Sequence, residues 1–542
     1  MRCRLLRVHQ ILLFCLLCIT FLVYVLNNEY LLRDIAKKVY SNLKVNLTVL
    51  QNNLIMDSDK LSIEENLEEM QKLYPNVPFQ LLGKINDKEQ SCKMFTNQKD
   101  NRLIYKEKND TNFFIKNSIT LNNQYWQEYR SKRCDRCISK VAFYLYSAYL
   151  DNRQYNGTGS AIRIIAMLEK DVKYDVTNYC LIWYDVSSDP VVSDVPLEMT
   201  PMGPKWKGKD SFVAYLLTCY VPRRHDGKIP KAVSIIEKRI KNRSCYKPYN
   251  YLKVIYNYEE KKDFAVCVKG LNLLQDNDLS AKFVQWIEVL KIMGADKIFL
   301  YEWALHPDIQ RVLNYYAKKG VVDLTKISLP GNQPNEKFQL DEYLKKDVEA
   351  KRVNLNIHLN DCFYRNIHRY KFIAIIDSDE VIVPREKGHT WIDLMKTLSN
   401  QYKPSNFYWF KNTYFFEDIS MSLSQVPSPD IPNSIHMLRH VYRSKNYLKG
   451  KSFISTEEVK TVGMHRAFKC LDGHNCNYNK VNENLAHVAH YRIGCQTMVG
   501  NATMCLEKFR KDVVWDTTLW EFEDVLVPRC KNTYSELGLK IY

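Results

Sequence analysis

The sequence lacks features that mark several large functional classes. It has no basic tail and no interleaving of Arg with aromatic residues, which disfavours nucleic-acid binding although 78 Lys and Arg face 61 Asp and Glu. The pair Cys134-x-x-Cys137 has no second Cys or His pair at zinc spacing, so a disulfide role is favoured over a zinc or redox site. With 46% hydrophobic and 12% aromatic residues, the chain is typical of a globular protein. We interpret the formal charge of +17 as a generally basic surface, with a phosphorylated ligand or an anionic membrane as alternatives.

The N-terminus indicates a membrane anchor. Three arginines among the first seven residues precede an uncharged, apolar stretch from Ile11 to Leu26. With its flanks this stretch reaches the roughly 20 residues that a bilayer span requires. A cleaved signal peptide has a similar layout, but no small residues follow Leu26, where cleavage would occur. We therefore expect a cytosolic tail at 1–10 and a signal anchor at 11–27, with the remainder luminal.

Two further features favour the luminal side of a membrane. N-x-S/T acceptors for N-glycosylation begin at Asn46, Asn109, Asn156, Asn242 and Asn501. Of the 16 cysteines, three lie in or before the expected anchor. In an oxidising lumen most of the others would form disulfides, with one left over and a connectivity that the sequence does not give.

Hydrophobic patterning divides the luminal part into three. Residues 28–90 have polar helical patches and no long apolar pattern, so we expect a stem. Short runs rich in β-branched and aromatic residues, separated by turn-forming clusters, predict a small antiparallel β-sandwich within a β-rich accessory domain at 91–255. From 256 to 530, strand-like and helix-like segments alternate, which predicts an α/β domain with a mostly parallel sheet and helices on both faces.

The segment FIAIIDSDEVIVP, Phe372–Pro384, contains the strongest local chemical signal. Asp377, Asp379 and Glu380 lie close together directly after an apolar run. Ligands of α/β sheets bind beyond the carboxyl ends of the strands, and Mg²⁺ or Mn²⁺ prefers carboxylate oxygens. The segment predicts a divalent ion that bridges the diphosphate of a nucleotide-sugar and neutralises the leaving group. A solvated turn is the alternative, since the motif is short.

Five ordered blocks between about residues 260 and 510 are more specific than any single motif. They read CVKGLNLLQDNDLSAKFVQWIEVLKIMGADKIFLYEW, LNDCFYR, KFIAIIDSDEVIVP, KSFISTEEVKTVGMH and AHYR. In this order they resemble glycosyltransferase family 92, formerly domain of unknown function 23. The β-rich region resembles an accessory region that precedes this domain in some members. Two departures are Val381, where the family usually has Phe or Leu, and Thr456, where a Pro is common.

This resemblance implies a GT-A-like, nucleotide-sugar-binding fold and a metal-dependent, inverting transferase with Mn²⁺ or another divalent metal. Characterised relatives use UDP-galactose and form β-linked galactose on glycans. We therefore expect a hexosyltransferase acting on a glycan acceptor carried by a glycoprotein or glycolipid. Anchor, stem and sequons independently suit a single-pass type II enzyme of the Golgi membrane.

The expected metal site is built around Asp379, with Asp377 binding either the metal or the donor ribose. GT-A enzymes often add a later histidine to the same metal, and His465 and His490 are the candidates. A structural role is the alternative for each histidine. Arg492 is expected at the donor diphosphate, with a structural ion pair as the alternative.

For other donor contacts and for the catalytic base, the sequence offers several candidate residues. Asn360, Asp361 and Arg365 lie on a predicted helix, where donor binding competes with a simple Asp361–Arg365 salt bridge. An inverting reaction needs a base to deprotonate the acceptor hydroxyl. Glu417 and Asp418 are our candidates, and the same reasoning admits the Glu457-Glu458 pair.

Two rival functions remain open at this point. The letters DSDEV also fit the nucleophile loop of haloacid-dehalogenase-like phosphatases, but about 110 residues of α/β pattern precede them and the later Gly-Asp-x-x-x-Asp element is absent from the C-terminal part. The other rival is a non-catalytic glycan-binding ectodomain that uses the β-sandwich. It predicts that Asp379→Ala changes no measurable function.

Overall fold

The computed structural model describes residues 71–72, 76–78, 121–122, 126–132, 140–153, 159–169, 177–184, 189–203, 212–237, 248, 250–276, 279–417, 436–495, 503 and 505–539. The expected tail and anchor, the five sequons, the Cys134-x-x-Cys137 pair and Asp418 lie outside these residues. No helix within the described ranges is both long and apolar enough to cross a membrane. The chain divides into two compact units, Met1–Lys72 and Leu73–Tyr542, and both large sheets belong to the second.

The first sheet has ten strands in the order β6-β5-β9-β10-β3-β4-β8-β7, with β1 and β2 beside β3. Its pairings are antiparallel except for β10 with β3. The strands are β1 (Leu121–Asn122), β2 (Trp126–Lys132), β3 (Lys140–Asp151), β4 (Ala161–Glu169), β5 (Tyr179–Trp183), β6 (Val191–Val192), β7 (Glu198–Pro201), β8 (Phe212–Tyr220), β9 (Ala232–Ile236) and β10 (Leu252–Ile255).

This sheet folds back on itself, as expected for the β-sandwich. Ile182 of β5 and Leu217 of β8 lie in one core, although four strands separate β5 from β8 in the sheet order. Phe143 and Leu145 of β3 belong to the same core. The disulfide Cys180–Cys219 joins β5 to β8 across the layers. The alternate β3 residues, such as Tyr144 and Tyr146, belong to a second core that the accessory sheet shares with the following domain.

The second sheet has the order β12-β13-β11-β15-β18-β17-β22-β16, with β14, β21 and β23 beside it. We expected a mostly parallel sheet, and the sheet is mixed. Parallel pairing joins β12, β13, β14, β11 and β15, and also joins β17 to β22 and β21. β15 with β18, β18 with β17 and β22 with β16 are antiparallel. Helical crossovers connect the parallel strands up to β15. Antiparallel neighbours can be joined without such a crossover.

The bounds of the remaining elements complete the fold. The strands are β11 (Lys262–Val268), β12 (Leu271–Leu273), β13 (Lys297–Leu305), β14 (Val322–Lys326), β15 (Tyr370–Ile376), β16 (Glu380–Pro384), β17 (Phe407–Phe416), β18 (Tyr442–Ser455), β19 (Val459–Val462), β20 (Ala467–Cys470), β21 (Tyr478–Lys480), β22 (Ala486–Arg492) and β23 (Val513–Trp515). The helices are α6 (Leu279–Met293), α7 (Pro307–Lys318), α8 (Lys337–Lys346), α9 (Val348–Asn366), α10 (Trp391–Gln401), α11 (His436–Arg439) and α13 (Glu523–Leu537), with shorter turns at Arg223–His225, Cys505–Arg510 and Thr518–Phe522.

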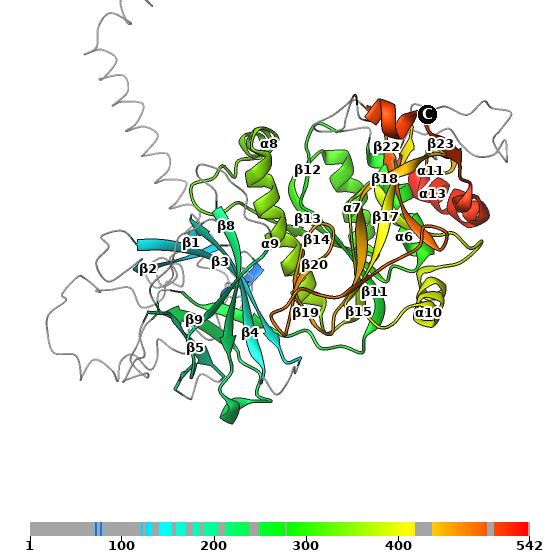
Figure 1. Ribbon diagram of the computed structural model, residues 1–542. Coiled ribbons are helices and arrows are strands. Elements are labelled where there is room, and N and C mark those ends of the chain that lie inside the picture. Colours follow the sequence, from blue (N-terminus) through cyan, green and yellow to red (C-terminus); the bar gives the residue numbers. More distant parts are fainter. Residues whose placement is uncertain are drawn as a thin grey trace, which may run out of the picture. The chain divides into compact units, whose positions relative to one another are not determined.

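Helices cover both faces of the second sheet, as predicted. Phe264, Val266 and Val268 of β11 face the core that contains α6, α7 and α13, whereas Ala265 and Cys267 face α9. Helix α9 lies between the two sheets (Figure 1) and contacts β3, β4 and β8 of the first. The accessory sheet therefore covers the outer side of the helix that packs behind β11 and β15.

Four disulfides join described cysteines, in agreement with the expectation of an oxidised protein. They are Cys180–Cys219, Cys267–Cys362, Cys470–Cys476 and Cys495–Cys505. Cys530 is a buried free thiol. Cys267–Cys362 ties β11 to α9, next to the strand end that carries Lys269.

Candidate functional site

The acidic turn lies at the carboxyl end of β15, as the sequence predicted. Asp377 begins the turn after Ile376, and Glu380 begins β16. The Asp377 amide donates to the Glu380 carboxylate (2.8 Å), and the Glu380 amide donates to the Asp377 carbonyl (3.1 Å). Glu380 is buried, whereas the Asp379 side chain is 45% exposed. Of the three carboxylates, Glu380 therefore closes the turn and Asp379 faces the solvent most fully.

Basic side chains from β18 and β22 and from the end of β11 compensate the three carboxylates. Lys269, which follows β11, places Nζ 2.8 Å from Asp377 Oδ2. Lys451 of β18 places Nζ 3.2 Å from Asp377 Oδ1 and 3.0 Å from Glu380 Oε2, and its side chain is only 2% exposed. His490 of β22 contacts both remaining carboxylates, with Nδ1 3.0 Å from Glu380 and Nε2 3.1 Å from Asp379.

The electrostatics of the turn follow from this pairing. Burial acts to raise the pKa of the Asp377 carboxyl, but Lys269 and Lys451 hold it well below its usual range. Burial also acts to raise the pKa of Asp379, but His490 has the larger effect and lowers that pKa. Burial acts to lower the pKa of His490, yet Asp379 and Glu380 raise it to about 9. The carboxylates are therefore ionised and His490 is protonated at neutral pH when no other cation is bound.

Two further side chains complete the surroundings of His490. Asn412 donates from Nδ2 to Glu380 Oε1 (2.8 Å) and lies 3.0 Å from His490 Nδ1. Arg492 Nε lies 3.1 Å from His490 Nε2, and its guanidinium lies over the Tyr414 ring, 5.9 Å from the centroid. The Nε2 lone pair can accept from Arg492 only when the ring is neutral, so Asp379 and Arg492 are alternative partners of this nitrogen.

His465 lies in the loop after β19, against the β18 segment that carries Lys451. Its Nδ1 is 2.9 Å from the Gly450 carbonyl, and Ser452 Oγ donates to the His465 carbonyl (2.8 Å). Burial and the nearby Lys451 lower the pKa of His465 to about 4. The ring is therefore neutral, and a hydrogen bond from Nδ1 leaves the Nε2 lone pair for a ligand.

Residues 262–529, about half of the chain, match the family model of glycosyltransferase family 92. The chain belongs to glycosyltransferase family 92. A search of curated proteins finds no match. The match begins at β11 and contains all of the acidic turn and its cations, whereas the accessory sheet precedes it. The activity of the family, sugar transfer from a donor to a glycan acceptor, therefore belongs to the second sheet.

The residues around the acidic turn fit a divalent metal only in part. No group of three or more His, Cys, Asp or Glu side chains that could hold a metal ion is found in the described part of the chain. Asp379 and His490 offer one exposed carboxylate and one imidazole side by side. Mg²⁺ and similar ions often take one or two protein ligands and complete their shell with water and substrate phosphates. Asp379 and His490 fit such an ion, whereas both Asp377 oxygens are paired with lysines.

The three helical residues predicted to bind the donor make contacts within the fold. Asp361 of α9 is completely buried and accepts hydrogen bonds from Ser147 (2.7 Å), Tyr149 (2.5 Å) and Tyr301 (2.7 Å). Arg365 pairs with Asp361 at 2.9 Å, which is the salt bridge weighed as the alternative. Together these contacts join α9 to the accessory strand β3. Asn360 binds the main chain of β19.

The candidate catalytic bases lie at different places relative to the acidic turn. The Glu417 amide donates to the Arg492 carbonyl (2.8 Å), and the Tyr491 amide donates to the Asp379 carbonyl (2.9 Å). Glu417 and Asp379 therefore flank β22 on its two sides, two strand spacings or about 10 Å apart in the main chain. Glu417 also pairs with Lys282 of α6 at 2.5 Å. Glu457 and Glu458 follow β18 where it meets the start of β15, at the opposite edge of the sheet from the acidic turn.

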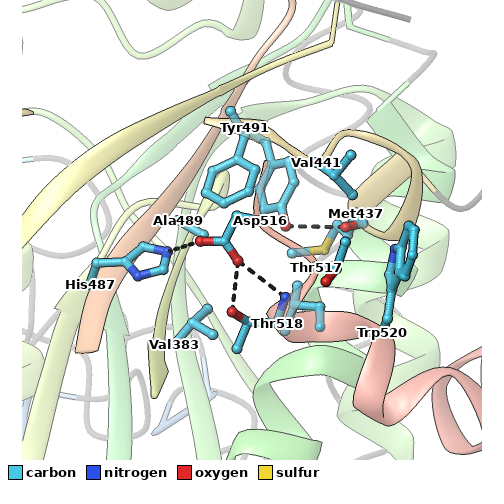
Figure 2. Close-up of a pocket in the computed structure, with 12 residues that line it drawn as sticks. Val383, Met437, Val441, His487, Ala489, Tyr491, Asp516, Thr517, Thr518 and Trp520 are labelled. Carbon is cyan, nitrogen blue, oxygen red and sulfur yellow. Dashed lines mark hydrogen bonds and ion pairs between the residues drawn. The ribbon is translucent and has the colours of Figure 1, made fainter. Parts of the chain in front are cut away.

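A separate small pocket lies on the other face of β22 (Figure 2). His487, Ala489 and Tyr491 line it, while His490 points to the opposite face of the strand. Asp516 lies within it and accepts two hydrogen bonds from Thr518. The cavity of about 10 Å³ has room for a single water and not for a sugar nucleotide.

Sequence reasoning missed Lys269, Lys451 and Asn412. The two lysines could have been noticed in the sequence, because each lies at the edge of an apolar stretch. Lys269 follows the stretch in AVCVKG, and Lys451 opens the stretch in KSFIS. Nothing in the sequence indicated that they meet Asp377. Asn412 lies in the middle of β17 and carries no local signal at all.

Proposed function

We propose that this protein is a metal-dependent, inverting glycosyltransferase that transfers galactose from UDP-galactose to a glycan acceptor with a β linkage. The family match supports sugar transfer in general. The observation that carries the metal dependence is the exposed Asp379 beside His490, with Asp377 and Glu380 already paired with lysines. UDP-galactose, inversion and the β linkage rest on the family resemblance. Asp379 and, once it has given up its Nε2 proton, His490 would hold an incoming ion that carries the diphosphate.

The protein's own side chains would share the work of the transfer. Lys269, whose side chain is 33% exposed, and Arg492 offer positive charge to the donor phosphates. A bound Mn²⁺ held by Asp379 and His490 would supply further positive charge to the leaving diphosphate. The acceptor oxygen bonds to the anomeric carbon as the bond from that carbon to the phosphate oxygen breaks, and UDP leaves with the electron pair. A carboxylate receives the acceptor proton, and Glu417 is our candidate for this role, with Asp418 the neighbouring alternative.

The expected location is the Golgi membrane, with the segment at 11–27 as a type II anchor and the transferase domain in the lumen. The disulfides of both sheets support an oxidising compartment. Family membership removes the phosphatase alternative. A non-catalytic glycan-binding protein remains the competing proposal.

A donor screen tests the proposed function. The protein with Mn²⁺ is expected to transfer or hydrolyse sugar from UDP-galactose in preference to other UDP-sugars. Asp379→Ala should lower kcat/KM by at least about 100-fold, since it removes a charge that acts on the leaving group. Asp263→Ala is the matched control, because Asp263 lies at the opposite end of β11 and pairs with the exposed Lys371. Absence of turnover with every UDP-sugar would sink the proposal.

Glu417→Gln tests the base. The amide keeps the shape of the side chain and cannot take up the proton, so kcat should fall by about 100-fold or more while the dissociation constant of the donor stays unchanged. A normal kcat would transfer the role to Asp418 or another group.

A further inference from the structure

The strand β19 leads to the His465 loop without belonging to the second sheet. It pairs with β20, and the register of this pairing is interrupted twice within four residues. β19 begins after the turn at the far end of β18, and its carboxyl end returns to Gly450 and Ser452, where His465 is bound. The placement of His465 beside Lys451 therefore depends on what holds β19.

Side chains of α9 hold the main chain of β19 on one side. Asn360 donates from Nδ2 to the Val462 carbonyl (2.9 Å) and accepts from the Val462 amide at Oδ1 (3.0 Å). Tyr364 donates its hydroxyl to the Lys460 carbonyl (2.7 Å). All four residues are buried. These side chains take the place that a neighbouring strand would take in a sheet.

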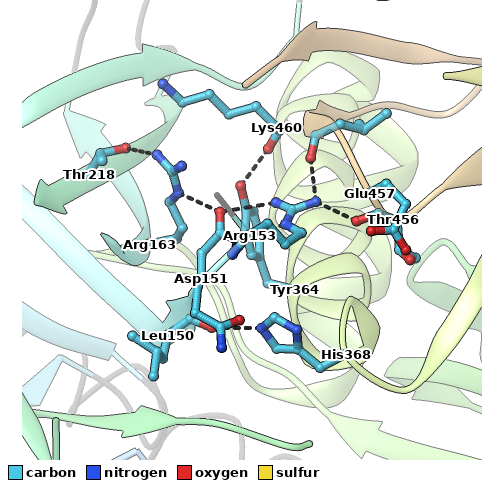
Figure 3. Close-up of polar contacts among 12 residues, drawn as sticks. Leu150, Asp151, Arg153, Arg163, Thr218, Tyr364, His368, Thr456, Glu457 and Lys460 are labelled. Atoms are coloured by element: carbon cyan, nitrogen blue, oxygen red, sulfur yellow. Dashed lines mark hydrogen bonds and ion pairs between the residues drawn. The ribbon is translucent and has the colours of Figure 1, made fainter. Parts of the chain in front are cut away.

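The accessory sheet holds the start of β19. Arg153, two residues beyond β3, donates from Nη1 to the Thr456 carbonyl (2.6 Å), as Figure 3 shows, and to the Val459 carbonyl (2.9 Å). Its orientation is fixed by Asp151, whose oxygens lie 2.8 and 3.0 Å from Arg153 Nε and Nη2. Arg163 of β4 pairs with the same carboxylate at 2.9 Å. Both arginine side chains are 7% exposed, so these bonds are made in the interior.

We propose that Arg153, Asn360 and Tyr364 are positioning residues of the donor site. Their hydrogen bonds to β19 fix the loop that presents His465 beside Lys451. The accessory sheet is thus a working part of the transferase and not a separate binding module. Asn360 acts on the donor through β19, which gives it a role in the reaction without contact with the donor. This inference rests on the proposed function for the ligand, a UDP-sugar, and for the place of that ligand beside Lys451 and His465.

A pair of hydroxyl deletions tests the proposal. Tyr364→Phe removes one hydrogen bond to β19, whereas Tyr149→Phe removes one from the same buried interface, to Asp361, without touching β19. The measurements are the dissociation constant of UDP-galactose with Mn²⁺, amide hydrogen exchange across 459–466, and the thermal unfolding midpoint. Tyr364→Phe should weaken donor binding by up to about tenfold, the equivalent of one net hydrogen bond, and speed exchange across 459–466. Tyr149→Phe should lower the unfolding midpoint and leave both other measurements unchanged.

Arg153→Lys extends the test to the accessory sheet. Lysine keeps the positive charge beside Asp151, but it cannot donate to the carboxylate and to both carbonyls at once. We therefore expect weaker donor binding and faster exchange across 459–466, as for Tyr364→Phe. Unchanged exchange in both variants, or equal loss of donor binding in Tyr149→Phe, would overturn the proposal. If the wild-type protein binds no UDP-sugar, the proposed function fails, and the exchange measurement still decides whether these residues fix β19.

Discussion

At the scale of single residues, Lys451 compensates the charge of two carboxylates in the acidic turn. Its ammonium is almost fully buried between Asp377 and Glu380, and the two carboxylates raise its pKa above the usual value although burial opposes this. A buried charge that loses its partner retains the whole cost of its desolvation. The lysine therefore determines both the shape of the acidic turn and which carboxylate remains open to solvent.

Replacing this lysine should be costly. Lys451→Met keeps the length of the side chain and leaves Asp377 and Glu380 short of one cation, so we expect a loss of about 3–5 kcal/mol in the free energy of unfolding. Urea unfolding measures it. The control is Lys371→Met, since Lys371 forms an exposed pair with Asp263 that should contribute little. Equal effects of the two substitutions would mean that other groups compensate the turn.

At the scale of elements, four strands and the turns beside them assemble the site. β11 supplies Lys269, β15 leads into the acidic turn, β18 supplies Lys451, and β22 supplies His490. The Cys267–Cys362 disulfide fixes β11 to α9, the helix that also holds β19. Rigid strands and one cross-linked helix thus hold the turns that carry Lys269, Asp377 and Asp379.

The disulfides differ in the length of chain they close. Cys267 and Cys362 are separated by 95 residues, and Cys470 and Cys476 by 6. Because the entropy removed from the unfolded chain grows with loop length, replacing the first pair by alanine should destabilise the protein by about 2 kcal/mol more than replacing the second. Denaturant unfolding of the two double variants provides the comparison. Equal losses would argue against a loop-entropy origin.

At the scale of the whole molecule, the two sheets of Leu73–Tyr542 form one structure. They share an apolar core, and the buried Asp361 joins them through Ser147 and Tyr149. The interior also holds neutral histidines: burial lowers the pKa of both His358 and His487 to about 3. Each of them couples the stability of the entire unit to pH.

The sign of this coupling follows from the direction of the shifts. Between pH 6.5 and about 3 an unfolded histidine binds a proton that the folded one does not, so stability is complete above pH 6.5 and declines as the pH falls. Each such histidine contributes up to about 1.4 kcal/mol per pH unit. His358→Phe keeps a ring for stacking on Tyr301 and removes the titration. Its unfolding free energy, measured between pH 6 and 5, should decline less steeply than that of the wild type, and parallel curves would contradict the assignment.

The sequence by itself determined the family, the strand–helix alternation from β11 to β15 and the position of the acidic turn after a buried strand, because these depend on local patterns and on the order of blocks. It also placed Asp379 and His490 among the candidate ligands. Only the tertiary structure decided that Lys269 and Lys451 pair with Asp377, that Asn360 holds β19, and that the sheet becomes mixed beyond β15. Those outcomes depend on pairings between segments far apart in the chain. The periodicity of one strand determines which face is buried, but it does not identify the partner strand or the side chain that neutralises a charge.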